Sequence, residues 1–320
     1  MWVVISKDLA SSFKGRDVIS TKDFSREELE LVFEVTEEIE KNVENHPENY
    51  DGMLRGKRIS LLFYESSTRT YDSFKAAIGI LGGRDPLGFR EPTQSSVKKG
   101  ESFVDTIRAY DMYGHAICLR HYAAGAAKLA AEVAKKPVIN CGDGNNEHPT
   151  QGILDLSTIK KVVGKIDGLK IAVMGDLKYG RTGSSLCYAL ANYDVELFFV
   201  TPPTLKMRDE VKLYLKEKDI KHSEYTNPDD VIPLIDVLYV TRIQEEKFPD
   251  KVEYEKVKGA YIVDMKLLEG GKKTLKVMHP LPRIDEVSTD VDESPFQAYF
   301  MNEERGPYCR AGLFKLLFGA

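Results

Sequence analysis

The stretch Ile59–Thr70, with the sequence ISLLFYESSTRT, gives the first indication of the fold of this chain. Its apolar half, Ile59–Tyr64, predicts a short buried β-strand. The segment that follows, Tyr71–Leu81, has apolar residues at helical spacing and predicts an α-helix. Because a buried strand followed at once by a helix is the first part of a parallel β–α–β unit, the stretch predicts an α/β fold.

The same alternation of short apolar runs and helical segments continues along most of the 320 residues. A capping box formed by Ser25 and Glu28 marks the start of an N-terminal helix. Further strands are predicted at Ala116–Leu119, Val138–Cys141, Lys170–Met174, Leu197–Val200, Val237–Val240, Tyr261–Val263 and Lys276–Met278. Further helices are predicted at Ser102–Tyr113, Ala124–Ala134, Thr150–Val163, Thr182–Leu190 and Arg208–Lys216. The last segment, Phe296–Phe318, predicts a closing helix that is broken near Gly306-Pro307.

A chain of this length is too long for one ordinary core and fits two domains. We therefore expect an α/β fold of two doubly wound parallel-sheet domains, with the active site in the cleft between them. The helix Thr150–Val163 follows a glycine-rich turn and is expected to be the hinge into the second domain.

Composition and charge argue against several classes of protein. Apolar runs such as Ile171–Met174 are far too short to cross a bilayer. The first residues form no basic leader, so we expect no signal peptide and a cytoplasmic location. A formal net charge of −5 argues against a general nucleic-acid binder. Scattered cysteines are expected to be buried thiols in a reducing compartment, and they are Cys118, Cys141, Cys187 and Cys309.

The hydroxyl-rich turn after the first strand predicts a phosphate site. Ser67, Thr68 and Thr70 surround Arg69 at the start of a helix, where backbone N–H groups and the helix dipole favour an anion. The alternative is an ordinary helix cap, which needs only one hydroxyl. Three hydroxyls around a guanidinium favour phosphate binding.

Other polar groups also follow predicted strands. His148 and Gln151 come after the turn Cys141–Gly144. A lone histidine there is more often structural than catalytic, and the glycine turn together with Gln151 brings the two interpretations close to even. Arg181 stands where a P-loop requires lysine, so the segment fails as a nucleotide site and suits a carboxylate instead. Arg242 and Gln244 follow another strand, where a solvated edge is the simpler interpretation.

Three further features carry little weight alone. Leu281-Pro282 lies in a rigid proline-rich loop that raises the chance of a cis peptide. Ser95 and Lys99 belong to a basic loop that could be mere solvated surface. Arg120 ends a strand. Together, however, the arginines at strand ends indicate a polyanionic ligand.

With these residues in view, the sequence resembles the catalytic chains of the aspartate carbamoyltransferases, within the aspartate/ornithine carbamoyltransferase superfamily. The resemblance runs in order along nearly the whole chain. It rests on Ser67-Thr68-Arg69-Thr70, Lys98-Lys99-Gly100-Glu101, Arg120-His121, Gly142-Asp143-Gly144 with His148-Pro149-Thr150-Gln151, Gly175–Thr182, Thr241-Arg242 with Gln244, and His279-Pro280-Leu281-Pro282-Arg283.

The resemblance implies a role for each of these groups. Arg69, Thr70, Arg120 and His148 are implied to be catalytic. The residues implied to bind carbamoyl phosphate are Ser67, Thr68, Arg69, Thr70, Arg120, His148, Gln151, Leu281 and Pro282, with Ser95 and Lys99 reaching in from a neighbouring subunit. Those implied to bind aspartate are Lys99, Arg181, Arg242 and Gln244.

The implied activity is transfer of the carbamoyl group to the α-amino group of L-aspartate, an early step of pyrimidine synthesis. The implied mechanism is direct attack, with no covalent enzyme intermediate, no metal and no cofactor. Residues 1–149 are implied to bind carbamoyl phosphate, with a helix at about 299–320 packing back onto them, and residues 150–298 to bind aspartate. A homotrimer with shared sites is implied, and a separate regulatory chain is left open.

Particular residues argue against three alternative functions. An ornithine carbamoyltransferase usually has cysteine where this chain has Pro280, and it lacks a need for the carboxylate-binding pair Arg242 and Gln244. A nucleotide-binding protein is disfavoured by Arg181. An inactive scaffold predicts the loss of a substrate-binding residue, and none is lost. Three positions depart from the usual family pattern, namely Tyr71, Tyr122 and Lys247.

Overall fold

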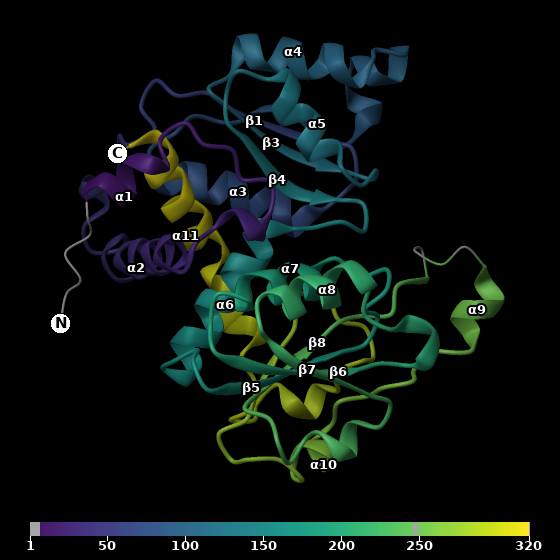
Figure 1. The fold of residues 1–320 in the computed structure, drawn as a ribbon. Helices are drawn as coiled ribbons and strands as arrows, with labels where there is room; N and C mark the ends of the chain where they lie inside the picture. Colours follow the sequence, from purple (N-terminus) through teal and green to yellow (C-terminus); the bar gives the residue numbers. More distant parts are fainter. Residues whose placement is uncertain (1–6, 246–247, 249, 320) are drawn as a thin grey trace. The chain divides into compact units, whose positions relative to one another are not determined.

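The computed structural model describes residues 7–245, 248 and 250–319. The chain forms two compact units (Figure 1). Unit 1 contains the described residues up to Thr150 and those from Arg305 onward, and unit 2 contains Gln151–Glu304. Each unit has its own parallel sheet, which confirms the predicted fold class of two parallel α/β domains.

The sheet of unit 1 has four parallel strands in the order β2-β1-β3-β4. The strands are β2 (Leu87–Phe89), β1 (Ile59–Phe63), β3 (Ala116–His121) and β4 (Val138–Asp143). All residues of β1 and β4 are buried, which explains why these strands are continuous apolar runs rather than alternating ones. The register pairs Phe63 with Arg120 and His121 with Asp143, so the carboxyl ends of the three longer strands lie at one edge.

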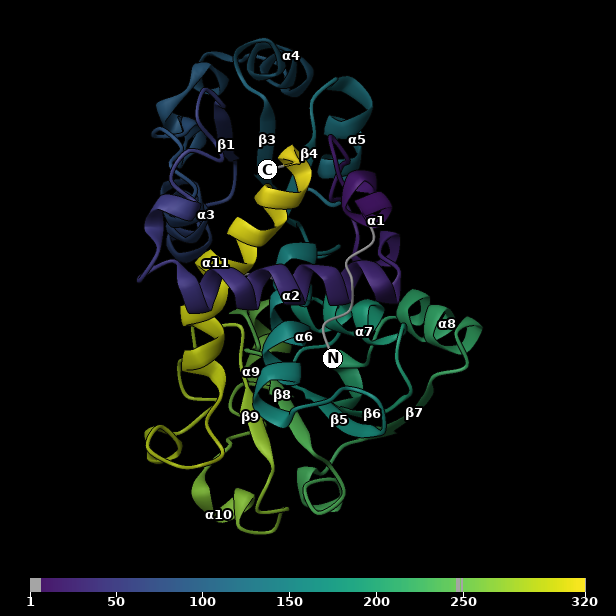
Figure 2. The same cartoon turned by 90° about the vertical axis from the view of Figure 1, so that its left-hand side faces the viewer.

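Helices cover both faces of this sheet. On one face, α4 (Phe103–Tyr113) and α5 (Ala126–Val133) form a core with alternate residues of the strands, including Leu62, Ile117 and Leu119. Figure 2 shows α3 (Thr68–Ile80) and α5 on opposite sides of the strands. The Phe74 ring of α3 packs edge-on against Phe314 of the C-terminal helix at 5.8 Å.

The chain begins with α1 (Lys7–Ser12), which the sequence pattern did not predict, and α2 (Arg26–Asn42). The capping box predicted for α2 is confirmed, because Ser25 and Glu28 each accept a hydrogen bond from the other's backbone N–H. Within unit 1, α2 crosses the C-terminal half of α11 (Tyr299–Phe318) (Figure 2). Lys315 of α11 forms a salt bridge with Glu38 of α2 at 3.0 Å.

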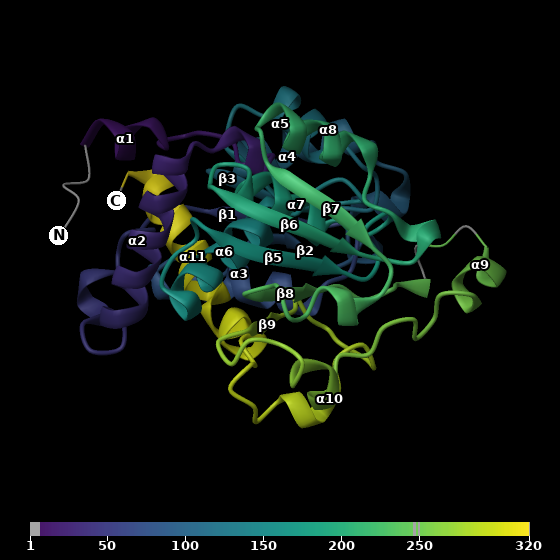
Figure 3. The same cartoon turned by 60° about the horizontal axis from the view of Figure 1, so that its bottom comes forward.

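The sheet of unit 2 has five parallel strands in the order β7-β6-β5-β8-β9, which lie side by side in Figure 3. Their bounds are β5 (Leu169–Met174), β6 (Val195–Val200), β7 (Lys221–Tyr225), β8 (Val237–Val240) and β9 (Lys276–Met278). The edge strand β7 was not predicted because it is polar and only partly buried.

One face of this sheet is covered by the helices α7 (Thr182–Leu190) and α8 (Asp209–Glu217) (Figure 1). The rings of Tyr188 and Tyr214 pack edge-on between these two helices. The helix α6 (Pro149–Val163) leads into unit 2. The opposite face packs against α10 (Met265–Leu268), neighbouring loops and the start of α11. A short helix, α9 (Lys251–Glu255), follows β8. Short 3-10 helices lie at Thr21–Asp23, Pro47–Asn49, Pro92–Gln94, Ser96–Lys99, Pro203–Leu205, Pro228–Asp230 and Thr289–Val291.

Two predictions were wrong. Tyr261–Val263 is not a strand, since only Val263 makes an isolated bridge, to Val287. The closing helix is not broken at Gly306-Pro307, because α11 runs through Pro307 without interruption. Proline removes one helical hydrogen bond. The buried side chains that follow it, such as Phe314, anchor the helix against this local cost.

All four cysteines are buried thiols, as predicted. Within the described part of the chain, no helix is both long enough and apolar enough to cross a membrane. The first residues, on which the expectation of no signal peptide rests, lie outside the described part.

Candidate active site

The hydroxyl-rich turn lies at the N-terminus of α3, which begins at Thr68, three residues earlier than predicted. Ser67 is the N-cap residue, but its side chain makes no capping hydrogen bond. Thr70 is buried, whereas Thr68 and Arg69 are exposed. The simple helix-cap interpretation of Ser67 is therefore wrong, and the first-turn N–H groups are oriented as in an anion site.

Arg120 lies beside this turn because the last residue of β1, Phe63, pairs with it in the sheet. Its Nη2 is 3.3 Å from Glu65 Oε2, and its Nη1 donates to the backbone carbonyl of Cys141 at 3.2 Å. These contacts anchor a mostly buried guanidinium at the carboxyl end of β3. Glu65 belongs to the quoted motif, yet no role was predicted for it. Its position directly after a strand was the signal.

His148 follows β4 in a loop that a network of carboxylates holds. The Asp143 carboxylate accepts hydrogen bonds from the N–H of Gly125 and from the side chain of Asn140. Glu147 accepts from the hydroxyl groups of Ser20 and Thr21, and burial raises the pKa of the Glu147 carboxyl. The His148 ring is buried, with Nδ1 3.4 Å from the Thr150 hydroxyl. The turn chemistry predicted around Gly142 and Gly144 is observed, since both have positive φ.

The basic loop forms a short 3-10 helix, Ser96–Lys99. Ser95 caps it, accepting from the N–H of Val97 at 3.3 Å and donating to the carbonyl of Pro92 at 2.8 Å. Lys99 is exposed at the end of this helix, before Gly100 with a φ of 91°. The loop is thus a defined structure that presents a cation to the solvent.

Gln151 lies in the first turn of α6, and its side chain is oriented by a neighbour one turn on. Its Nε2 donates to Asp155 Oδ1 at 2.8 Å. Both side chains are buried. No role was predicted for Asp155, although a carboxylate four residues after a functional amide on a helix is a recognisable signal.

The segment after β5 brings Arg181 to the N-cap position of α7. Gly175 begins this segment with a φ of 116°, and a Cβ there would lie 2.1 Å from the carbonyl oxygen of Thr241. Only glycine therefore allows the ends of β5 and β8 to approach this closely. Asp176 Oδ1 accepts from the N–H groups of Lys178 and Tyr179 at 3.1 and 2.8 Å. Burial raises the pKa of Asp176 to about 6.

Arg242 and Gln244 follow β8 and are partly buried rather than on a solvated edge. The strands β5 and β8 are neighbours that pair Met174 with Val240, so the segments bearing Arg181 and Arg242 leave adjacent strand ends. Arg242 lines a pocket of about 200 Å³ together with Thr241, Lys258 and Glu286. Unit 2 thus has two arginines at neighbouring strand ends, which suits a ligand with carboxylates.

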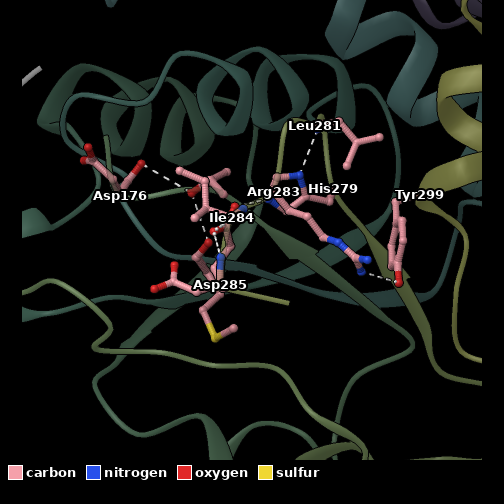
Figure 4. Close-up of polar contacts among 10 residues, drawn as sticks. Asp176, His279, Leu281, Arg283, Ile284, Asp285 and Tyr299 are labelled. Carbon is pink, nitrogen blue, oxygen red and sulfur yellow. Dashed lines mark hydrogen bonds and ion pairs between the residues drawn. The ribbon is translucent and has the colours of Figure 1, made fainter. Parts of the chain in front are cut away.

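The loop after β9 carries Leu281, which has a φ of 50° and a cis bond to Pro282, as predicted for the proline-rich loop. The N–H of Leu281 donates to His279 Nδ1 at 2.8 Å, and His279 Nε2 is 2.8 Å from Glu286 Oε1 (Figure 4). The other oxygen of Glu286 accepts from the N–H groups of Ile284 and Asp285. A buried His–Glu pair therefore determines the path of this loop.

Arg283, which follows Pro282 in the same loop, points away from the pair of His279 and Glu286 (Figure 4). It donates to Asp292 and, at 3.0 Å, to the Tyr299 hydroxyl. Arg283 therefore joins this loop to Asp292 and to Tyr299 at the start of α11.

Two of the three positions that depart from the family pattern, Tyr71 and Tyr122, pack against neighbouring side chains. Tyr71 packs its ring edge-on against Phe63 at 5.2 Å, and the guanidinium of Arg90 lies over it. Tyr122 is exposed, and its ring lies tilted against the His121 ring with the centroids 4.3 Å apart. Lys247 lies outside the described residues.

In each unit, then, the predicted site residues gather at the carboxyl ends of parallel strands. Unit 1 brings together Ser67, Thr68, Arg69, Thr70, Arg120 and His148, and the adjacent strand ends of unit 2 bear Arg181, Arg242 and Gln244. Among the described residues, no cluster of three or more histidine, cysteine, aspartate or glutamate side chains could hold a metal ion.

Two parallel α/β units with guanidinium, hydroxyl and amide groups near the carboxyl ends of their strands have the architecture and chemistry that suit anionic small molecules. Two family models match nearly the whole chain. The model described as aspartate/ornithine carbamoyltransferase, carbamoyl-P binding domain, matches residues 16–161, and the one described as the Asp/Orn binding domain matches residues 167–317. The chain belongs to the aspartate/ornithine carbamoyltransferase family.

Within this family, several similar proteins are named as aspartate carbamoyltransferase catalytic subunits. The aspartate carbamoyltransferase catalytic subunit of Thermococcus kodakarensis is 51% identical over 310 residues, covering 96% of this chain and 98% of the relative. The aspartate transcarbamoylase of Trypanosoma cruzi, solved with carbamoyl phosphate and aspartate, matches with a TM-score of 0.90 at 34% identity, covering 96% and 98% of the two chains. The catalytic subunit of M. jannaschii aspartate transcarbamoylase matches with a TM-score of 0.84 at 45% identity, covering 94% and 97%.

Proposed function

We propose that this chain is an aspartate carbamoyltransferase, which transfers the carbamoyl group of carbamoyl phosphate to the α-amino group of L-aspartate. The products are N-carbamoyl-L-aspartate and phosphate, in an early step of pyrimidine synthesis. The observation that carries the proposal is the 51% identity to an aspartate carbamoyltransferase catalytic subunit over 96% of the chain. Similar solved structures hold carbamoyl phosphate, aspartate or N-(phosphonacetyl)-L-aspartic acid.

Unit 1 is proposed to bind carbamoyl phosphate. The phosphate is held by the hydroxyls and N–H groups of Ser67, Thr68 and Thr70 at the start of α3, with Arg69 supplying positive charge. Support comes from the Ser67 hydroxyl, which does not cap the helix and so keeps its capacity for a ligand. Helix N-termini of this kind are established anion sites.

The carbonyl oxygen of the carbamoyl group is proposed to accept hydrogen bonds from Arg120, His148 and Thr70. As the aspartate amine attacks, negative charge develops on that oxygen, and donors already fixed in place stabilise it. The contacts of Arg120 with Glu65 and Cys141 supply that fixation. Gln151 and the Leu281 carbonyl, in the loop that includes Pro282, are proposed to receive the carbamoyl amine.

Unit 2 is proposed to bind aspartate. Arg181, Arg242 and Gln244 pair with its two carboxylates, and Lys99 adds a further cation. The adjacency of β5 and β8 supports this assignment, because it starts both arginine-bearing segments from neighbouring strand ends. We also propose that residues 1–149 and 150–298 are the functional domains.

The chemistry needs no covalent intermediate on the enzyme. The α-amino nitrogen of aspartate forms a bond to the carbamoyl carbon, the bond to the phosphate oxygen breaks, and phosphate leaves as a stable anion. The enzyme contributes orientation of the two substrates and stabilisation of the oxyanion. Arg120 and His148 are proposed to carry out the second of these roles.

The proposal extends to the oligomeric state of the chain and to its location in the cell. A homotrimer is proposed in which Ser95 and Lys99 act on the site of a neighbouring subunit. The exposed and structurally defined loop that carries Lys99 is the support. A separate regulatory chain would be an additional partner. The four buried thiols suit the reducing cytoplasm.

The proposal is tested by measuring phosphate release from carbamoyl phosphate by the purified chain, with aspartate and ornithine supplied in parallel. We expect release together with N-carbamoylaspartate formation, and only with aspartate. Turnover with ornithine would contradict the assignment of Arg181 and Arg242 to carboxylates. Inactivity of a folded trimer with both amino acids would contradict the proposed reaction.

A further inference from the structure

Asp155 is the centre of a buried polar network in unit 2. Its side chain is fully buried in α6. Oδ1 accepts from Gln151 Nε2 at 2.8 Å and from Asn302 Nδ2 at 2.7 Å, while Oδ2 accepts from the Tyr239 hydroxyl at 2.6 Å. Three donors converging on one buried carboxylate are what an ionised group needs to remain in a core.

This network determines which way the Gln151 amide faces. Oδ1 of the Asp155 carboxylate accepts a hydrogen bond from Asn302 and has no proton to donate. The Gln151 atom beside Oδ1 must therefore be the amide nitrogen, which is a donor. The carbonyl oxygen Oε1 is then on the opposite side of the amide, where it presents an acceptor. An amide free to rotate would offer nitrogen or oxygen with similar ease.

We propose that Asp155 is a positioning residue that holds the Gln151 amide so that only its oxygen, Oε1, faces the ligand. The site therefore selects a ligand with an –NH₂ group on its carbonyl carbon. This inference rests on the proposed function, in which Gln151 receives the carbamoyl amine. An –NH₂ group donates to Oε1, whereas a methyl group in its place leaves Oε1 without a partner. Asp155 itself does not contact the ligand.

Tyr239 provides a matched control, because it contacts the same carboxylate from β8. Its hydroxyl donates to Oδ2, while Gln151 donates to Oδ1. Tyr239→Phe removes a bond to Asp155 without touching the bond that orients Gln151. It is expected to lower thermal stability and to leave the ligand preference as it is.

The experiment measures binding of two stable analogues by calorimetry on the intact protein. Phosphonoacetamide carries the –NH₂ group, and 2-oxopropylphosphonate carries a methyl group in its place. The quantity of interest is the ratio of their two dissociation constants, since a general structural defect weakens both alike. Asp155→Leu and Gln151→Met are each expected to reduce the wild-type preference for the amide about tenfold.

The double variant tests whether the two residues act as one. If Asp155 works through Gln151, combining Asp155→Leu with Gln151→Met reduces the preference no further than Gln151→Met alone. A further additive loss would overturn the proposal. So would a folded Asp155→Leu protein that keeps the full wild-type preference.

Asp155→Asn covers the case in which Asp155→Leu does not fold. Its Oδ1 can accept from both Gln151 and Asn302, and its Nδ2 can donate to the Tyr239 hydroxyl, so a hydrogen bond to each of these three residues can be kept. The variant is expected to keep the amide preference. Loss of the preference in folded Asp155→Asn would count against the inference. The proposed function is tested separately, because failure of the wild-type chain to make N-carbamoylaspartate would contradict that function. The ratio of the two dissociation constants can be measured whether or not the chain is active.

Discussion

The Nδ1 atom of His279 accepts a hydrogen bond of 2.8 Å from the backbone N–H of Leu281, while Nε2 of the same ring is 2.8 Å from Glu286 Oε1. The ring is therefore neutral, with its proton on Nε2. Burial lowers the pKa of His279 despite the neighbouring Glu286. Hydrogen bonds from His279 and backbone N–H groups outweigh the effect of burial on Glu286 and lower the pKa of that carboxyl. The pair thus combines a neutral imidazole with a carboxylate.

Acidification should therefore release the Leu281 loop. A proton on Nδ1 removes the acceptor for the Leu281 N–H. Because the pKa of His279 in the folded chain lies below the ordinary value of 6.5, the unfolded chain takes up the proton first. Stability is then fully present above about pH 6.5 and falls as pH drops toward the lowered folded pKa. We expect the thermal midpoint to fall over this range. Affinity for phosphonoacetamide should fall only at lower pH, near the lowered pKa at which His279 of the folded chain takes up its proton.

Two substitutions separate the roles of the two ring nitrogens. His279→Asn keeps an acceptor near the position of Nδ1 and cannot take up a proton, so its affinity for phosphonoacetamide should lose this acid sensitivity. His279→Gln extends toward Glu286 and leaves Leu281 without its acceptor at every pH. The prediction is wrong if His279→Gln binds the analogue as well as His279→Asn at pH 8.

The arginines at the ends of the unit 2 strands should act on aspartate alone. Arg181→Lys and Arg242→Lys keep the positive charge but lose the planar fork that pairs with a carboxylate at two points. We expect the KM for aspartate to rise about tenfold or more in each, which corresponds to roughly 1.4 kcal/mol. Phosphonoacetamide affinity measured without aspartate serves as the control and should stay within about twofold. An equal loss of both affinities would contradict the assignment.

The interiors of both sheets could be predicted from the sequence because their strands are buried on both faces. The predicted bounds of β8, β9 and α7 agree with the structure. The edge strands β2 and β7 were missed because neither forms a continuous buried run. At Pro307 a local rule failed, since packing along α11 outweighs one missing hydrogen bond.

The candidate site shows the same division between local and long-range information. The residues that we propose to contact a ligand occur in short motifs, so Ser67–Thr70 or Arg242 could be identified as candidates from the sequence. Residues that orient them depend on the fold. Tyr239 contacts Asp155 across 84 positions of sequence, and no local pattern indicates that contact. Asp155 and Gln151 are the exception, because helical spacing places them together.

Asp176 should lower stability at neutral pH. Its Oδ2 is buried and has no hydrogen-bond partner among the described residues. Burial raises its pKa from 3.8 to about 6, so the folded chain binds the proton more tightly than the unfolded chain. Stability contributed by this group is therefore present at acid pH and is lost as pH rises through about 4 to 6. Asp176→Asn removes the buried charge and keeps an acceptor for the N–H groups of Lys178 and Tyr179.

We expect Asp176→Asn to be more stable than wild type at pH 8 by about 1–2 kcal/mol, measured by chemical denaturation. The difference should shrink as the pH falls from 8 to 4, because the wild-type carboxyl becomes neutral as well. A difference that is constant over this range would contradict the account.

Two salt bridges between α2 and α11 allow the effect of burial on an ion pair to be measured within unit 1. Arg305 is 1% exposed and its Nε lies 3.0 Å from Glu40, whereas Lys315 pairs at 3.0 Å with Glu38, whose side chain is 46% exposed. Glu40→Gln neutralises the carboxylate that pairs with the buried guanidinium and is expected to cost about 3 kcal/mol. Glu38→Gln makes the same chemical change at an exposed pair and should cost less than about 1 kcal/mol. Denaturant midpoints of the two variants, taken with unchanged m-values, give the comparison.

Adding 1 M salt should diminish the small effect of Glu38→Gln and leave most of the larger effect of Glu40→Gln, because a buried pair is screened far less. Equal costs for the two variants would mean that Arg305 is held by its packing within α11 and not by its charge.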